Sequence, residues 1–112
     1  MPLKIRRDNL ATHAVVLSVV GELDLVSHDE LDDAVDAAVR NDPTDLVLDL
    51  TGLTFCDSTG LGLFVRSHRR MTDCGGRLSL VGVQPQVLKV IKLTGLDAAL
   101  RICPDVTVAL AG

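Results

Sequence analysis

The sequence contains very few aromatic residues. Phenylalanine, tyrosine and tryptophan make up 2% of its 112 residues, and tyrosine and tryptophan are both missing. Proteins that bind single-stranded nucleic acid stack bases on aromatic side chains, so this mode of binding is not expected. The formal net charge of −4 at pH 7 also argues against a nucleic-acid partner, because phosphate backbones attract clusters of Lys and Arg.

Cysteines and long apolar runs are scarce as well. The three cysteines (Cys56, Cys74 and Cys103) are far apart and show no Cys-x-x-Cys spacing, so neither a disulfide framework nor a zinc site is expected. No apolar run approaches the roughly 18 residues that span a bilayer, and residues 1–10 lack the apolar segment of a signal peptide. We therefore expect a cytoplasmic protein with no membrane partner, bound metal or cofactor.

Hydrophobic residues are plentiful, and strand and helix patterns alternate along the chain. They make up 47% of the sequence, enough for one well-filled core. Apolar and β-branched runs predict strands at 3–6, 13–20, 45–50, 77–81 and near 101–102. Helical periodicity predicts a helix between Ser27 and Asn41, a second over about 58–73, a third from Pro85 to before Gly95, and a helical or frayed tail at 106–111.

Local signals suggest how these elements begin and connect. Ser27 followed by Glu30 fits a capping box, and the polar pair Asp8-Asn9 would form the turn of an N-terminal hairpin. Strands that alternate with helices imply parallel strands joined by right-handed crossovers. We predict one α/β domain over residues 1–112, with a mixed sheet of four or five strands and the main helices mostly on one face.

The most informative segment is LVLDLTGLTFCDSTGLG, at residues 46–62. An apolar run ends in a short loop, and a helical pattern begins at Ser58, directly after Asp57. Unpartnered backbone N–H groups and the positive end of the helix dipole favour negative charge at such a position. Ser58 could therefore cap the helix, lie beside a bound phosphate, or be phosphorylated itself.

Two chemical alternatives for this segment are weaker. A nucleophile elbow has the pattern Gly-x-Ser-x-Gly, whereas Cys56 stands two residues before Ser58, and nothing brings a histidine to the hydroxyl. The nucleotide-binding patterns GxxxxGK[ST] and GxGxxG are both missing, which leaves at most a weak anion site. From local chemistry alone, capping and phosphorylation both stay open.

Four segments, in order, resemble the STAS domain of bacterial anti-sigma factor antagonists over about residues 13–103. They are GELD at 21–24, LDL at 48–50 leading into FCDSTGLG at 55–62, GG at 75–76 and LTGL at 93–96. The Asp-Ser-Thr-Gly-Leu-Gly block is the specific one. The resemblance implies a STAS-like fold and a regulatory binding protein rather than an enzyme.

The resemblance also implies a mechanism. In such proteins the unphosphorylated antagonist binds an anti-sigma factor that is also a GHKL-type serine kinase, and the sigma factor is released. Phosphorylation ends the binding, and a PP2C-type phosphatase resets the antagonist. The phosphoacceptor would be Ser58, with Thr59 as a second candidate, while Asp57 and Asp24 would belong to the partner-binding surface. The alternative is a STAS scaffold subunit of a larger signalling or transport assembly.

Three more residues of the second helix are candidates for partner contact. Glycine lowers helix propensity by about 1 kcal/mol per site, so Gly60 and Gly62 need a reason. Close approach of a partner and tight packing on the chain's own strands are both open. Leu63 is expected to be exposed because it falls off the predicted buried stripe. That stripe consists of Leu61, Phe64, Val65, His68 and Met71.

Overall fold

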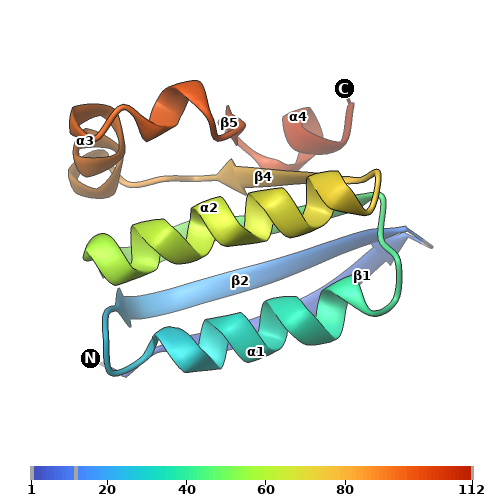
Figure 1. Ribbon diagram of the computed structural model, residues 1–112, viewed down its shortest axis with the longest axis horizontal. Helices are drawn as coiled ribbons and strands as arrows, with labels where there is room; N and C mark the ends of the chain where they lie inside the picture. The colour runs from blue at the N-terminus through green and yellow to red at the C-terminus, as the bar shows by residue number, and fades with distance from the viewer. Residues whose placement is uncertain (1, 12, 112) are drawn as a thin grey trace.

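The computed structural model describes residues 2–11 and 13–111, which form a five-stranded sheet in the order β1-β2-β3-β4-β5 (Figure 1). The strands are β1 (Lys4–Ala11), β2 (Ala14–Leu23), β3 (Asp45–Cys56), β4 (Arg77–Val81) and β5 (Ile102–Cys103). The helices are α1 (His28–Val39), α2 (Ser58–Asp73), α3 (Pro85–Leu93), the 3-10 helix η1 (Leu96–Ala98) and α4 (Val106–Ala111).

β1 pairs antiparallel with β2, and the remaining neighbours pair in parallel. The predicted mixed α/β fold with an N-terminal hairpin is therefore confirmed. The predicted domain boundaries, 1–112, include residues 1, 12 and 112, which lie outside the described residues.

Alternation along the strands divides the apolar side chains between two faces of the sheet. One face carries the main core, which α1, α2 and α3 cover, and α1 and α2 lie side by side in front of the sheet in Figure 1. On the opposite face, Ala109 of α4 packs on a smaller cluster. That cluster contains Val16, Val47, Val81 and Cys103. The main helices thus lie mostly on one face, as predicted.

The sequence suggested a hairpin turn at Asp8-Asn9, and this prediction is wrong. These residues belong to β1, where Asp8 pairs with Val16 and Asn9 with Val15. Each accepts a side-chain hydrogen bond from the arginine two residues earlier, Asp8 from Arg6 at 3.2 Å and Asn9 from Arg7 at 3.1 Å. Polar residues are stable on this exposed edge strand, so their polarity did not mark a turn.

β3 is longer than predicted and runs to Cys56, where a loop was expected after Leu50. The extra residues pair with β2 through two register shifts, between Ser18/Val20 and between Gly21/Glu22. At Gly52 the strands are so close that a Cβ would lie 2.8 Å from Cγ2 of Val20. The extended strand ends at Cys56, directly before Asp57.

α1 begins without the predicted capping box. Ser27 occupies the N-cap position but makes no side-chain cap hydrogen bond. Its hydroxyl donates instead to the carbonyl of Glu22 at 2.8 Å. Asp24 orders the turn before the helix, because its Oδ1 accepts the backbone N–H groups of Val26 and Ser27, both at 3.0 Å.

α2 is buried over a wider arc than predicted. The helix contacts α1 on one side and β3 and β4 on the other, so more than one stripe of side chains is covered. Leu63 has no exposed surface, and the prediction that it is exposed is wrong. Val65 and His68, placed on the buried stripe, are only half-buried, whereas Ser67 is buried.

Candidate functional site

Ser58 is the first residue of α2, and α2 starts on the side of the sheet where the arrow of β2 ends (Figure 1). β3 ends beside β2 at this point. Cys56 pairs with Leu23, and the N–H of Asp57 donates to the carbonyl of Leu23 at 3.1 Å, which fixes the two strand ends side by side. Ser58 is exposed, as expected for a phosphoacceptor. Within residues 2–11 and 13–111 no hydrogen bond holds its side chain, so the hydroxyl is not committed to the fold.

Asp57, rather than Ser58, caps α2. Its backbone is extended, at φ −93° and ψ −173°, and its Oδ1 accepts the N–H of Gly60 at 3.1 Å. Its carbonyl accepts the N–H of Leu61 at 3.0 Å and so closes the first turn of the helix. The interpretation of Ser58 as the capping residue is therefore wrong, and its hydroxyl is left for another role.

Asp24 holds the loop between β2 and α1 in place. Its Oδ1 accepts the N–H groups of Val26 and Ser27 and also the hydroxyl of Ser27, the last at 3.1 Å. Hydrogen bonds, first of all the one from the Ser27 backbone, hold the pKa of Asp24 below its usual value of 3.8. The carboxylate is therefore ionised at neutral pH and orders a loop whose outer side chains point away from the core.

Three exposed apolar side chains lie at these strand ends, and sequence reasoning missed them. Leu25 and Val26, in the loop after β2, are 71% and 91% exposed, and Phe55, near the end of β3, is 48% exposed. Leu25 and Val26 are adjacent in the chain, and contiguous exposed apolar side chains with polar neighbours are typical of protein-docking surfaces. The available signal was the pair Leu25-Val26, which stands between a strand and a helix and belongs to the period of neither.

The two glycines of α2 have different surroundings. A Cβ at Gly60 would lie 2.5 Å from Sγ of Cys56 and 2.8 Å from Cδ2 of Leu23, so Gly60 is required by packing inside the chain. A Cβ at Gly62 would meet only the tip of Arg66, with Nη1 at 3.3 Å. Internal packing therefore accounts for Gly60 but not for Gly62, which lies on the half-exposed surface of the helix with space above its Cα.

The predicted site residues fall into an exposed or half-buried group and a buried pair. Asp24, Asp57, Ser58 and Thr59 lie together at the ends of β2 and β3 and the start of α2, and all four are exposed or half-buried. Gly62 follows them one helical turn along α2. Gly60 and Leu63 are buried and do not belong to this surface.

The thiol next to the site is inert. Burial, reinforced by the negative charge of Asp57, raises the pKa of Cys56 to about 12, so the thiol stays protonated near neutral pH. In the described part of the chain, no group of three or more His, Cys, Asp or Glu side chains is placed to hold a metal ion. The available chemistry at this edge of the sheet is thus that of an exposed hydroxyl beside a carboxylate.

Known proteins share this architecture. A family model described as "Mlab, STAS domain" matches residues 7–104. The chain belongs to the STAS domain family. This STAS chain is 31% identical over 97 residues to the anti-sigma-F factor antagonist RsfB of Mycobacterium tuberculosis, a match that covers 87% of this chain and 79% of RsfB. It is 28% identical over 86 residues to an anti-sigma-B factor antagonist of Staphylococcus aureus, which covers 77% of this chain and 80% of the relative.

A solved structure confirms the expected STAS-like fold. The crystal structure of an anti-sigma factor antagonist from Mycobacterium paratuberculosis superimposes on this STAS chain with a TM-score of 0.87 at 29% identity, covering 97% of this chain and 92% of that one. Among the helices that the described residues form, none is long and apolar enough to cross a membrane.

Proposed function

We propose that this STAS chain is an anti-sigma factor antagonist switched by phosphorylation at Ser58. The unphosphorylated form binds an anti-sigma factor with GHKL-type serine kinase activity, and the sigma factor is released. Phosphorylation of Ser58 by that partner ends the binding, and a PP2C-type phosphatase restores it. The names of the RsfB and S. aureus relatives support this role and do not favour a scaffold subunit of a larger assembly.

One observation supports the proposal most strongly: Ser58 is exposed, is not hydrogen-bonded through its side chain, and starts a helix that another residue caps. A kinase can reach such a hydroxyl without unfolding the domain. The exposed Leu25 and Val26 provide apolar surface beside it for a partner to cover.

The fold should tolerate the modification. Phosphorylation adds a charge of about −1.5 to −2 and three acceptor oxygens. The N–H groups of Ser58 and Thr59 belong to the first turn of α2, where backbone donors have no partner inside the helix and the dipole favours an anion. Asp57 adds a second negative charge nearby, which repels the phosphate, but its Oδ1 accepts a hydrogen bond from the N–H of Gly60.

The partner interface should not tolerate it. A docked partner would bury a dianion beside Asp57 in what had been a close contact, and an uncompensated charge in an interface costs several kcal/mol. Because about 1.4 kcal/mol corresponds to a tenfold change in affinity, a loss of two to four decades is expected. The switch therefore needs no conformational change in the STAS domain.

Phosphosite mapping tests the assignment. The purified chain is incubated with ATP and the GHKL-type ATPase encoded nearest to its gene, and the phosphopeptides are mapped by mass spectrometry. The wild type should gain one phosphate at Ser58, and Ser58→Ala should gain none while it still binds the ATPase. Thr59→Val is the matched control and should be modified like the wild type. Phosphate on Thr59 in the wild type, or incorporation that survives Ser58→Ala, would show that the proposed site is wrong.

A further inference from the structure

The loop between β2 and α1 is held by hydrogen bonds among its own residues. Oδ1 of Asp24 accepts the N–H groups of Val26 and Ser27, both at 3.0 Å. The carbonyl of Asp24 accepts the N–H of His28 at 2.9 Å, which joins the loop to the first residue of α1. The backbone is therefore fixed on both sides of Leu25, at the residue before it and at the residues after it.

Leu25 itself is held by a single side chain. Of the residues that the structure describes, only His28 makes a hydrogen bond with Leu25, because Nδ1 of the imidazole lies 2.9 Å from the Leu25 carbonyl oxygen. A carbonyl oxygen can only accept, so Nδ1 carries a proton and donates it to this bond. The Leu25 side chain is 71% exposed, so packing against the core does little to fix it.

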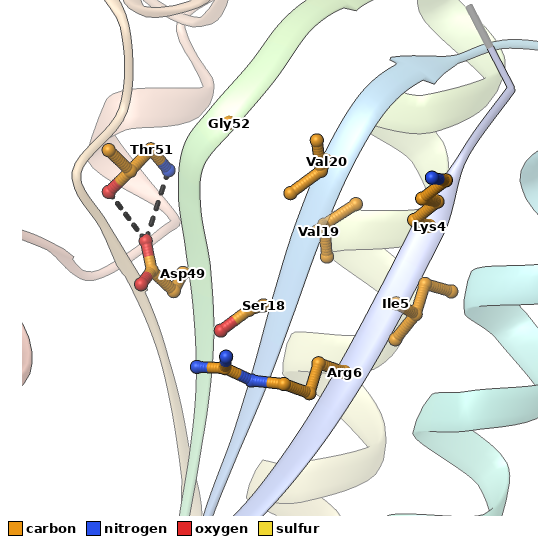
Figure 2. Close-up of a pocket in the computed structure, with 9 residues that line it drawn as sticks. All are labelled: Lys4, Ile5, Arg6, Ser18, Val19, Val20, Asp49, Thr51 and Gly52. Carbon is orange, nitrogen blue, oxygen red and sulfur yellow. Dashed lines mark hydrogen bonds between the residues drawn. The ribbon is translucent and has the colours of Figure 1, made fainter.

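A similar arrangement on β3 shows what the loop lacks. Figure 2 shows Oδ1 of Asp49 accepting the N–H and the hydroxyl of Thr51, at 3.0 Å and 2.6 Å, so an aspartate again holds the residue two positions later. The residue between them, Leu50, is fully buried and is fixed by the main core. Leu25 has the equivalent position in the loop without such packing, so the hydrogen bond from His28 takes its place.

The imidazole of His28 is well placed for this role. Its side chain is only 23% exposed. The other ring nitrogen, Nε2, lies 3.3 Å from Oδ1 of Asp29, whose side chain is 82% exposed. Exposed ion pairs contribute little, so the hydrogen bond to the Leu25 carbonyl is the more important contact of the ring. Helix formation does not require histidine here, because the first turn of a helix favours acidic side chains.

We propose that His28 is a positioning residue, whose Nδ1–H fixes the carbonyl of Leu25 and so presents the Leu25 side chain to the partner. The inference rests on the proposed function, in which this loop docks on the anti-sigma factor kinase. A partner that meets an ordered loop avoids the loss of conformational freedom that ordering a mobile loop would cost. Because one hydrogen bond inside a protein shifts an equilibrium by up to about tenfold, removal of the imidazole should weaken binding about three- to tenfold.

A series of substitutions at His28 tests this role. The full chain is titrated in a calorimeter with the GHKL-type ATPase encoded nearest to its gene, and His28→Ala should raise the dissociation constant about three- to tenfold. Asn carries an amide N–H close to the position of Nδ1, whereas Gln carries one close to the position of Nε2. His28→Asn should therefore restore the wild-type affinity, and His28→Gln should not. His13→Ala, at an exposed histidine directly before β2, is the matched control and should bind normally.

Two further measurements separate positioning from a general loss of stability. If His28 acts through Leu25, the two effects on binding are not additive, and His28→Ala should weaken the Leu25→Ala variant by less than about twofold. Nitrogen chemical shifts of the ring, measured by NMR at a pH where the ring is neutral, should show the proton on Nδ1. Melting curves check that each variant is folded.

The outcomes distinguish this inference from the proposed function. His28→Ala that binds as tightly as the wild type, additive effects of His28→Ala and Leu25→Ala, or a neutral ring with its proton on Nε2 would overturn the positioning role. If the wild type binds the ATPase and Val26→Asp does not, the docking function of the loop stands even when His28→Ala binds normally. A wild type that does not bind the ATPase would refute the proposed function, and the positioning role with it.

Discussion

Gly60 and Gly62 lie two residues apart in α2, yet the same change to alanine should alter stability in opposite directions. A Cβ at Gly60 would approach Sγ of Cys56 to 2.5 Å and Cδ2 of Leu23 to 2.8 Å, and both neighbours are buried. A Cβ at Gly62 would meet only Nη1 of Arg66, at 3.3 Å, and that flexible side chain is exposed.

The magnitudes follow from two opposing effects. Replacing glycine by alanine inside a helix gains up to about 1 kcal/mol. Forcing an extra carbon into a packed core costs about 1–3 kcal/mol. Three heavy atoms would lie within 2.8 Å of the new carbon at Gly60, so the packing cost there should be near the upper end of this range. Gly60→Ala should therefore lower the free energy of unfolding by about 1–2 kcal/mol, while Gly62→Ala should raise it by about 0.5–1 kcal/mol.

Urea unfolding followed by circular dichroism measures both changes. In a domain of this size, 1 kcal/mol corresponds to roughly 4–8 °C in melting temperature, so thermal melts provide a second measurement. Adding Cys56→Ala to Gly60→Ala removes the closest clashing atom, and the pair should be less destabilised than the sum of the single changes. If Gly60→Ala stabilises the chain as much as Gly62→Ala does, the proposed collision does not exist.

Three further predictions concern the residues around Ser58. Asp57→Ala removes the cap of α2 and should cost about 1 kcal/mol in urea unfolding, whereas Asp57→Asn, which keeps an acceptor oxygen, should cost less. Folding lowers the pKa of Asp24, so its stabilising contribution is present above the unfolded value near 3.8 and is lost as pH falls through the lower folded pKa. Asp24→Asn should therefore reduce the dependence of the free energy of unfolding on pH in that acidic range, and an unchanged pH profile would refute this. Val26→Asp should weaken partner binding at least tenfold with little change in melting temperature, whereas Val108→Asp, an exposed valine on α4, should bind normally.

Much of the fold could be predicted because the sequence signals agree with one another. β4 lies at 77–81 as predicted, and α2 begins at Ser58 and ends at Asp73 as predicted. In both segments, apolar periodicity, glycine positions and length indicate the same element. The alternation of strands and helices then predicts a parallel sheet with right-handed crossovers and a hairpin at its edge.

The errors arise where tertiary contacts override a local pattern. Leu63 lies off the main apolar stripe, but α1 covers a second side of α2, and no single-helix pattern reveals a second neighbour. Ser27 has the spacing of a capping residue, yet its hydroxyl is engaged by the carbonyl of Glu22, five residues earlier. The extension of β3 to Cys56 depends on register shifts against β2, which only the pairing itself defines.

The candidate site was predicted in part. The block at 57–60 identified the junction of β3 and α2 because its glycine and hydroxyl residues interrupt an apolar run. The exposed Leu25 and Val26 were missed because single apolar residues carry no information about burial without the packing around them.

The affinity of the chain for its anti-sigma factor kinase, measured by calorimetry before and after phosphorylation of Ser58, tests the central claim most directly. We expect a dissociation constant 10²–10⁴-fold higher for the phosphorylated chain, because the dianion enters the interface uncompensated. Its stability should change by no more than about 1 kcal/mol, because the first turn of α2 accommodates the charge. Equal affinity of the two forms, or a loss of binding that accompanies unfolding of the domain, would contradict the account.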